Sequence, residues 1–517
     1  MPIYNAPIQD MKFILNDVFN AADFWQKNEQ LAHVDSDTVN MILEEMSKFA
    51  KNTLLPINRS GDEEGAQYLG EGKVKTPTGF KAAFDEYAQG GWIGLGGDPN
   101  HGGQGMPKMV TMLAEEMVFT ANQSFALYPN LSGGACMCIY NAGSEEQKQT
   151  YLEKIYSGEW TGTMCLTEPH AGTDLGIIKT KAVPNEDGSY NITGTKIFIT
   201  AGEHDLADNI IHLVLAKTPD APAGSKGISL FIVPKFHVNA DGSLGERNAV
   251  SCGSIEHKMG IKASATCVMN FDGAKGFMVG AENTGLASMF IMMNYERLTM
   301  GLQGIGGAEL AYQNATAYTL DRIQGRADSG IQEPNKAADP IVFHADVRRM
   351  LLNAKTISEA SRCFAMYVAK ELDTNKYTDD AAARKAADDR VALLTPVAKA
   401  FLTDRGLEAS IDAQQCFGGH GYIREWGMEQ IVRDTRISQI YEGTNGIQSL
   451  DLLGRKVVKN GGAFVTTYVQ EMRDFANNMN ADHAIKQAIL TSADKLEDLT
   501  KAVVAAAAVN KDEINGC

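Results

Sequence analysis

Cysteine and histidine are scarce in this sequence, and their spacing matches no common metal site. The 517 residues hold eight cysteines without a CxxC pair and ten histidines without an HExxH motif. We therefore expect reduced thiols, no metal and a cytoplasmic protein. No secretory signal pattern is present. The first 30 residues carry only Lys12 and Lys27 as basic residues, so an Arg-rich mitochondrial leader is not expected either.

Positive charge and long apolar runs are also lacking. The chain has 47 basic against 64 acidic residues, a net charge of −17. Nucleic-acid binding needs basic surface, so we expect no nucleic-acid partner. No apolar run reaches the roughly 18 residues that span a bilayer, so no integral membrane segment is expected. A hydrophobic fraction of 44% is enough for several domains with substantial cores.

The pattern along the chain changes from helical to β and back to helical. Asp35, Ser36 and Asp37 are candidate N-caps for the first regular helix. The middle stretch consists of short β-branched runs broken by turns, without βαβ alternation, so a Rossmann-type site is not expected. Long amphipathic helices are expected at residues 285–325, 343–373 and 382–416. The sequence predicts five segments: an N-terminal extension (1–38), a helical domain (39–159), a β domain (160–282), a second helical domain (283–456) and a helical extension (457–517).

One carboxylate stands in a setting that suits a buried general base. Glu442 follows Ile440 and Tyr441 and precedes Gly443. Burial raises the pKa of a carboxyl group toward the range in which it abstracts protons. Gly443 would let the backbone come close to a ligand. A glutamate before a glycine is more often a surface residue at a helix end, so the interpretation of Glu442 depends on the other motifs.

Four groups of motifs, two of them made of two runs each, follow one another along the chain. They are MCLTEPHAGTD at 164–174, GTKIFITAG at 194–202, YER at 295–297 with DRIQGR at 321–326, and QCFGGHGY at 415–422 with YEGT at 441–444. With these motifs in this order and spacing, the chain resembles the flavin-dependent acyl-CoA dehydrogenase family from about residue 40 to about residue 455. The terminal extensions and the residues of the DRIQGR and GGHGY motifs most resemble the 3-methylmercaptopropionyl-CoA dehydrogenase branch.

The resemblance implies an α+β fold with a helical N-terminal domain, a middle antiparallel β domain and a C-terminal four-helix bundle, with FAD in the crevice between them. It also implies α,β-dehydrogenation of an acyl-CoA thioester to the trans-2-enoyl-CoA. Glu442 would take the α-proton while a hydride passes to flavin N5. Electrons would then pass to an electron-transfer flavoprotein. The substrate would be 3-methylmercaptopropionyl-CoA or a short- or medium-chain acyl-CoA.

The resemblance assigns several residues of the β domain to the flavin. Thr167 is expected to hydrogen-bond the ring near N5, with Met164 and Leu166 beside it. Phe198 stands where many family members have tryptophan, and it keeps an aromatic face for the ring. Thr200 would contact the flavin through its hydroxyl. Taken alone, a pair like Phe198 and Thr200 belongs much more often to an ordinary strand.

Other cofactor contacts are implied across a subunit boundary. Arg322 and Gln324 correspond to residues that reach the FAD diphosphate of a neighbouring subunit, a role that the planar guanidinium of arginine suits. Gln415 and Gly419 would meet the adenosine half, and Thr444 matches another FAD contact. A homodimer or homotetramer is therefore expected.

The implied substrate contacts are fewer. Thr173 lies where the family binds the cofactor and the pantetheine arm of CoA. Arg297 matches an arginine of the CoA channel, Asn294 replaces an aspartate three residues before it, and Gly443 follows the base. A structural salt bridge is the alternative for Arg297. The acyl pocket is expected among residues 120–140, together with Phe290 or Met293.

Two other functions fit parts of this pattern. An acyl-CoA oxidase on the same scaffold would differ in whether dioxygen reaches the reduced flavin, and no residue decides this. A flavin-bearing DNA-binding paralogue would need a basic C-terminal region. The acidic composition and the presence of Glu442 argue against that second alternative.

Overall fold

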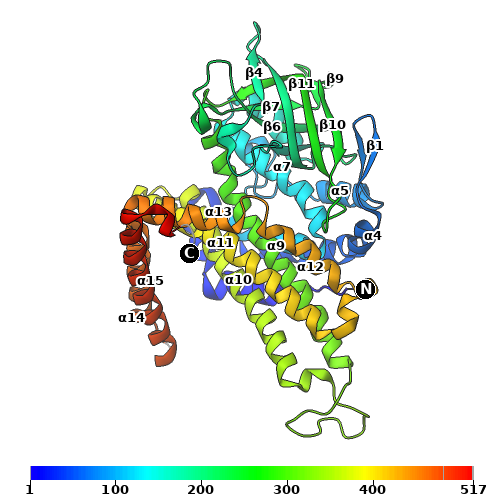
Figure 1. Cartoon of the computed structure of the whole chain (residues 1–517), viewed down its shortest axis with the longest axis vertical. Coiled ribbons are helices and arrows are strands. Elements are labelled where there is room, and N and C mark those ends of the chain that lie inside the picture. Colours follow the sequence, from blue (N-terminus) through cyan, green and yellow to red (C-terminus); the bar gives the residue numbers. More distant parts are fainter. Residues whose placement is uncertain (1, 481, 515–517) are drawn as a thin grey trace.

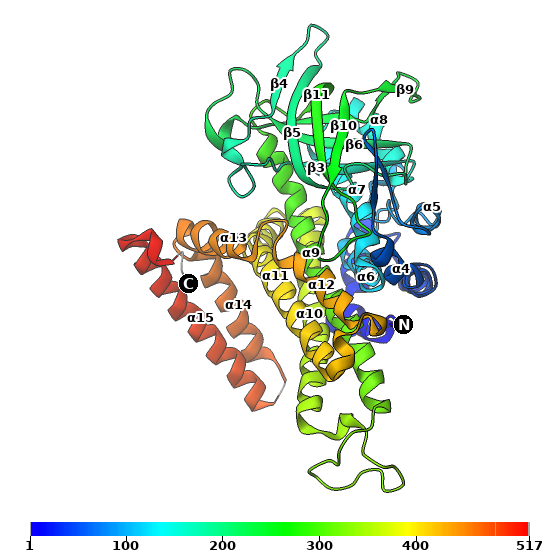
Figure 2. The same ribbon diagram turned by 45° about the vertical axis from the view of Figure 1, so that its right-hand side comes forward.

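The computed structural model describes residues 2–480 and 482–514, without the side chains of Ile291, Asn294 and Glu513. Figures 1 and 2 show a β domain at one end of the molecule and a long bundle of helices at the other. The N-terminal helices lie where the two meet. Helix α6 (Lys108–Ala121) packs against the bundle, and α7 (Gln123–Ala142) packs against both the bundle and the sheet.

The N-terminal part is helical, as the sequence predicts. Asp35 Oδ1 accepts a hydrogen bond from the backbone N–H of Thr38 at 2.7 Å, so Asp35 is the N-cap of α3. This bond satisfies an N–H that has no partner within the first helical turn. The other elements here are α1 (Ile8–Phe13), α2 (Ala21–Gln26), α3 (Ser36–Phe49), α4 (Pro56–Glu64), β1 (Gln67–Gly70), β2 (Lys73–Lys75), α5 (Phe80–Gln89) and α8 (Glu145–Tyr156).

The middle part is a seven-stranded sheet in the order β3-β6-β7-β11-β5-β4, with β10 beside β11. Its strand pairs are antiparallel, as expected, except that β3 and β6 run parallel. A parallel pair needs a long connection, and β4 and β5 supply it because they lie between β3 and β6 in the chain. The strands are β3 (Trp160–Cys165), β4 (Lys181–Pro184), β5 (Tyr190–Thr200), β6 (Asn209–Ala216), β7 (Ser229–Pro234), β8 (Phe236–Val238), β9 (Leu244–Arg247), β10 (Val250–Ile255) and β11 (Thr266–Val279).

Three long helices and one short helix form the C-terminal bundle. The long helices α9, α10 and α11 lie along one another, and α12 packs against α9 and α11 as the fourth member (Figure 2). The three long helices match the predicted ones to within a few residues. The C-terminal elements are α9 (Gly285–Asp321), α10 (Ala345–Tyr377), α11 (Ala381–Cys416), α12 (Met428–Arg436), α13 (Asn445–Leu450), α14 (Ala463–Asn478) and α15 (His483–Val509).

Helices α14 and α15 form a hairpin that stands beside the bundle (Figures 1 and 2). An apolar cluster around Val465 joins the hairpin to Leu393 of α11. Arg390 of α11 also pairs with Glu471 of α14 at 2.6 Å. Among the helices in the described part of the chain, none is both long and apolar enough to cross a membrane.

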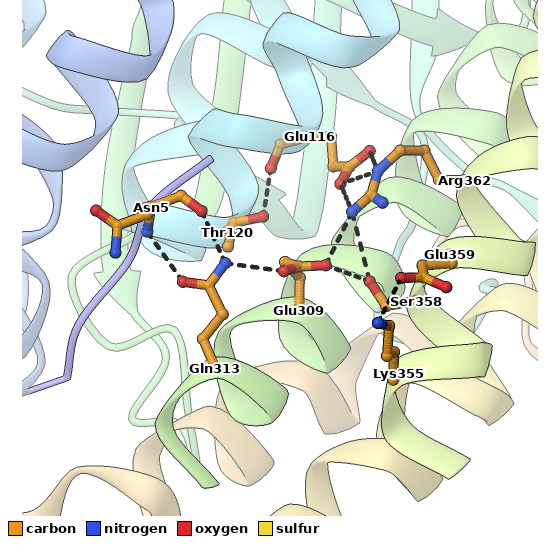
Figure 3. Close-up of polar contacts among 9 residues, drawn as sticks. All are labelled: Asn5, Glu116, Thr120, Glu309, Gln313, Lys355, Ser358, Glu359 and Arg362. Atoms are coloured by element: carbon orange, nitrogen blue, oxygen red, sulfur yellow. Dashed lines mark hydrogen bonds and ion pairs between the residues drawn. The ribbon is translucent and has the colours of Figure 1, made fainter. Parts of the chain in front are cut away.

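A buried group of charges joins the N-terminal part to the bundle (Figure 3). Arg362 of α10 donates to Glu116 of α6 from Nε at 2.8 Å and from Nη2 at 2.7 Å, and to Glu309 of α9 at 2.9 Å. All three side chains are buried. A buried carboxylate keeps its charge only when a cation and hydrogen bonds compensate for the lost water, so both glutamates depend on Arg362.

The same network holds the beginning of the chain. Gln313 of α9 donates to Glu309 and to the carbonyl oxygen of Asn5, both at 2.8 Å, and accepts from the N–H of Asn5 at 2.9 Å (Figure 3). Asn314 makes a similar pair of bonds to the backbone of Ile3, at 2.9 and 3.0 Å. Residues 3 to 5 are therefore fixed against α9, with Tyr4 buried and Ile3 and Asn5 exposed on either side of it.

Replacing Arg362 with methionine should destabilise the protein strongly. The change keeps an unbranched side chain but leaves Glu116 and Glu309 buried without a cation, which typically costs about 3–5 kcal/mol. Urea denaturation followed by circular dichroism measures the effect. Arg349→Met is the control, because Arg349 is exposed and pairs only with Asp346 on the surface of the same helix. Equal midpoints for the two variants would contradict the role given to Arg362.

Candidate active site

Glu442 lies on a strained turn between a short 3₁₀ turn (Ile437–Gln439) and α13. Its φ is 54°, in the left-handed region that costs a non-glycine residue roughly 1–3 kcal/mol. Gln448 donates to the carbonyl oxygens of Glu442 at 3.2 Å and Gly443 at 3.1 Å, and Thr444 caps α13 with its hydroxyl. These bonds hold Glu442 in a backbone conformation that an isolated peptide would avoid.

Two buried cations lie close to this turn. Lys399 of α11 is fully buried and donates from Nζ to Asn445 Oδ1 at 2.8 Å. Arg297 of α9 is also buried and pairs with Asp451 at 3.1 Å. The salt bridge considered as the alternative for Arg297 is therefore present. Its Nε has no hydrogen-bond partner within the described residues.

Nearby charges set the acidity of Glu442. Burial raises the pKa of Glu442 above its ordinary value, while the charges of Lys399 and Arg297 lower it. The charge of Glu442 also acts on a second acid, Glu296: burial raises the pKa of Glu296 to about 8, and the charge of Glu442 adds to the rise. Asn130 Nδ2 donates to Glu296 Oε2 at 2.6 Å. The site thus contains a candidate base and a second carboxyl that is mostly neutral at pH 7.

Glu296 lines a cavity of about 730 Å³, a size typical of small-molecule pockets. Helices α6, α7 and α9 form much of its wall. Ala126, Pro129 and Gly133 come from the region 120–140, where the acyl pocket is expected. The cavity therefore brings Glu296 together with that region, and Glu442 itself is not among the residues that line it.

The candidate flavin residues of the β domain come together where β3 and β5 approach. The carbonyl oxygen of Thr167 accepts from the N–H of Ile197 at 2.9 Å. The carbonyl oxygen of Thr200 accepts from Thr163 Oγ1 at 3.0 Å. Segments that lie 30 or more residues apart in sequence thus form one surface.

A buried ion pair fixes the loop after β3. Lys196 Nζ donates to Glu168 at 2.9 Å and to the carbonyl oxygen of Leu166 at 3.0 Å. Burial alone would raise the pKa of Glu168, but the charge of Lys196 and several hydrogen bonds bring it down to about 2. Met164 is buried beside this loop. Phe198, by contrast, is 59% exposed and has a left-handed φ of 59°, which leaves its ring accessible.

The other predicted cofactor residues lie at the far end of the bundle. Tyr318 of α9 stacks on Phe417, with ring centroids 4.1 Å apart, and its hydroxyl lies 2.8 Å from His420 Nδ1. These contacts join the end of α9 to the end of α11. The four candidates at this end are exposed: Arg322, Gln324, Gln415 and Gly419.

This far end is well separated from Glu442. Arg297 lies close to Glu442 and Arg322 follows the last turn of the same helix. At about 1.5 Å of rise per residue, the helix from Arg297 to Arg322 spans roughly 37 Å. One subunit therefore does not bring the two groups of residues together.

The remaining predicted residues are scattered. Thr173 is exposed in the loop after β3, and Gly443 and Thr444 belong to the turn of Glu442. The side chain of Asn294 lies outside the part of the chain that the structure describes. Glu296 stood in the YER motif, but its neighbours in sequence do not show that it faces a cavity.

Lys399, Asn130 and Gln448 were not predicted. Each occupies an ordinary position in a helix, and no local motif marks any of them. Burial could have been inferred for Lys399 only from the packing of α11 against the turn. These residues become visible as site residues only in three dimensions.

Comparison with known proteins extends over most of the chain. Models of the acyl-CoA dehydrogenase N-terminal, middle and C-terminal domains match residues 36–159, 163–274 and 283–457. The chain is 43% identical over 489 residues to 3-methylmercaptopropionyl-CoA dehydrogenase from Ruegeria pomeroyi, which covers 94% of this chain and 82% of that relative.

Two solved structures share the fold. Butyryl-CoA dehydrogenase from Megasphaera elsdenii is 26% identical with a TM-score of 0.66, over 82% of this chain and 98% of that one. An acyl-CoA dehydrogenase from Bacillus anthracis, complexed with FAD, is 23% identical with a TM-score of 0.75, over 94% of this chain and 78% of that one.

These matches confirm the fold class and the resemblance that the four groups of motifs indicated. They follow the same order along the chain: a helical part, a β part and a second helical part. The chain belongs to the acyl-CoA dehydrogenase family, whose members are oxidoreductases acting on CH–CH groups.

Proposed function

We propose that this protein dehydrogenates an acyl-CoA thioester across its Cα–Cβ bond, giving the trans-2-enoyl-CoA, with Glu442 as the base. The setting of Glu442 carries the proposal. Its carboxyl has a raised pKa, and Gln448 holds its turn, with Lys399 and Arg297 close by. A general base works best when its pKa lies near the working pH.

Glu442 contributes twice to the proton step. Its carboxylate accepts the α-proton. No hydrogen bond within the described chain uses its backbone N–H, which is therefore free to donate to the thioester carbonyl oxygen. A positioned donor of this kind lowers the barrier by roughly 3 kcal/mol, because it stabilises the charge that develops on that oxygen. When bound, FAD supplies the acceptor for the hydride that leaves Cβ.

The residues present fit FAD. Phe198 offers an exposed aromatic face close to Thr167 and Thr200, and this surface suits a flavin ring. Arg322 is exposed and makes no ion pair within the described chain, so its guanidinium is available to a diphosphate. A Cβ placed on Gly419 would meet no atom within 4 Å, so a ligand could approach the backbone there.

A shared cofactor would explain the separation of roughly 37 Å between the two ends of the site. Residues near Glu442 would serve the flavin of their own subunit, and the far end would serve the cofactor of a neighbour. We therefore infer a homodimer or homotetramer. The complete proposed cofactor set is Met164, Leu166, Thr167, Thr173, Phe198, Thr200, Arg322, Gln324, Gln415, Gly419 and Thr444, and the proposed substrate set is Thr173, Asn294, Arg297 and Gly443.

Several finer statements belong to the same proposal. The electron acceptor would be an electron-transfer flavoprotein. The 3-methylmercaptopropionyl group named for the Ruegeria relative is one candidate acyl group, beside short- and medium-chain ones. A cytoplasmic location is supported by the seven cysteines of the described chain, all of which are free. The division of the chain into five segments, with boundaries after residues 38, 159, 282 and 456, also belongs to the proposal.

Replacing Glu442 with glutamine should abolish the chemistry while leaving binding in place. The amide is nearly the same size and keeps the backbone N–H, but it does not accept the α-proton. Flavin reduction at saturating acyl-CoA should fall by at least about 10³-fold in anaerobic stopped-flow measurements. Glu146→Gln, an exposed change on α8, is the control. Reduction at the wild-type rate in Glu442→Gln would mean that another residue is the base.

Replacing Lys399 with methionine should move the pH profile of flavin reduction to higher pH. Lys399 lowers the pKa of Glu442, so its loss raises that pKa and reduces the deprotonated fraction at pH 7. Lys399→Arg should restore part of the wild-type profile because it restores the charge. Lys385→Met on the exposed face of the same helix is the control. An unchanged profile in Lys399→Met would show that the lysine does not tune the base.

Replacing Arg322 with alanine should weaken FAD retention and the oligomer together. The lost guanidinium is proposed to hold the diphosphate across a subunit boundary. Gel filtration with light scattering, combined with the ratio of flavin to protein absorbance, measures both properties. Arg384→Ala, an exposed change in the first turn of α11, is the matched control. A monomeric Arg322→Ala protein with full FAD would refute the shared site.

A further inference from the structure

Glu296 is a buried acid in the cavity wall without a cation beside it. It is only 4% exposed and makes no ion pair within the described chain. Its hydrogen-bond donor there is the side-chain amide of Asn130, at 2.6 Å. Burial of an unpaired carboxylate is unfavourable, so the group is held in its neutral form, with a pKa of about 8 caused by burial and then by the charge of Glu442.

Other acids of the same cavity have partners that stabilise their charge. Glu115 accepts from Lys108 Nζ at 2.7 and 2.8 Å. Asp373 accepts from the backbone N–H groups of Lys108 and Met109, at 2.7 and 2.9 Å. Glu296 therefore differs from its neighbours in what it offers a ligand: a neutral carboxyl group can donate a hydrogen bond as well as accept one.

The position of the donor follows from the contacts. Asn130 donates to Oε2, so the acidic proton of neutral Glu296 belongs on the other oxygen, Oε1. That oxygen lies beside Gly134: a Cβ built there would come within 2.6 Å of it. Gly134 also lines the cavity, and its lack of a side chain lets the Glu296 carboxyl and Met292 pack against its backbone, since a Cβ there would also clash with Met292 Cε.

We propose that Glu296 is a specificity-determining residue that donates a hydrogen bond from its neutral carboxyl to an oxygen atom of the acyl chain beyond Cβ. The favoured substrates are then neutral acyl-CoA thioesters with an ether, hydroxyl or keto oxygen at that position, in preference to hydrocarbon chains of equal length. The position beyond Cβ follows because Glu442 must reach Cα, whereas Glu296 lines the cavity in which the rest of the acyl chain is expected. This inference rests on the proposed dehydrogenase function and deepens it.

The preference should depend on pH. Below about pH 8 Glu296 is protonated and donates, and above it the ionised carboxylate only accepts and repels an oxygen. The charged and titratable groups around it are Glu442 on its turn, Lys108 and Glu115 on α6, Asp373 on α10, and the paired Arg297 on α9. At each pH, all these groups affect proton removal in the same way for two substrates that are compared. The ratio of the two kcat/KM values therefore isolates the contact with the acyl oxygen.

The test measures kcat/KM of the FAD-loaded enzyme for three acyl-CoA substrates of equal chain length. These are hexanoyl-CoA, 4-methoxybutyryl-CoA and 3-ethoxypropionyl-CoA, in which one methylene is replaced by oxygen at successive positions. In Glu296→Leu the ratio of the better ether to hexanoyl-CoA should fall by about three- to tenfold, the effect of one lost hydrogen bond. In wild type this ratio should fall as pH rises through about 8. In Glu296→Gln it should stay flat, because an amide donates at every pH.

Each of the following results contradicts either the inference about Glu296 or the proposed dehydrogenase function. Suppose the kcat/KM ratio of the better ether to hexanoyl-CoA is the same in wild type and Glu296→Leu, while Glu442 is still needed to oxidise hexanoyl-CoA. That result overturns the inference and leaves the proposed function intact. A ratio in Glu296→Gln that follows pH as in wild type also overturns it. Loss of flavin reduction in Glu296→Gln as deep as in Glu442→Gln would make Glu296 part of the proton chemistry and overturn it too. Failure of the wild-type enzyme to reduce its flavin with any of the three would refute the proposed function itself.

Discussion

Charge buried along helix α9 is the constraint on which the rest of the structure depends. Glu309 of α9 and Glu116 of α6 both pair with Arg362 of α10, and these ion pairs join the N-terminal part to the bundle. Arg297 pairs with Asp451, whereas the hydrogen-bond partner of Glu296 among the described residues is a neutral amide. Because burial penalises uncompensated charge, these partners must be in place before α9 can lie in the core. The same helix therefore links the stability of the bundle to the acidity of the site.

The base itself is held by several weak contacts on a strained turn. Gln448 binds the carbonyl oxygens at Glu442 and Gly443, and Lys399 binds Asn445 a few residues later. Strain at Glu442 is tolerated because these neighbours determine the local conformation. The arrangement leaves the backbone N–H of Glu442 without a partner in the described chain, next to a carboxyl whose burial raises its pKa. Donor and base are thus presented by one residue.

Sequence reasoning reached the features that local chemistry determines. Helix periodicity predicted α9, α10 and α11, and N-cap preference gave three candidates, of which Asp35 is the cap. The apolar neighbours of Glu442 suggested a buried residue, and Glu442 is half-buried beside an exposed Ile440. Sequence reasoning did not find Lys399, because a buried lysine in a helix looks like an exposed one until the helix is packed. The parallel pair of β3 and β6 was also out of reach, since strand order depends on contacts far apart in sequence. The far-end residues became a connected group only once Tyr318 was seen to stack on Phe417.

The central claim is that Glu442 removes an α-proton while the bound flavin becomes reduced. Anaerobic mixing of the FAD-loaded wild-type enzyme with hexanoyl-CoA, unlabelled or deuterated at C2, tests it most directly. The account predicts loss of the yellow flavin absorbance with both substrates, and a slower loss with the deuterated one, because the C2–H bond breaks in the step observed. Flavin absorbance that decays at the same rate with either substrate, or does not decay at all, would contradict it.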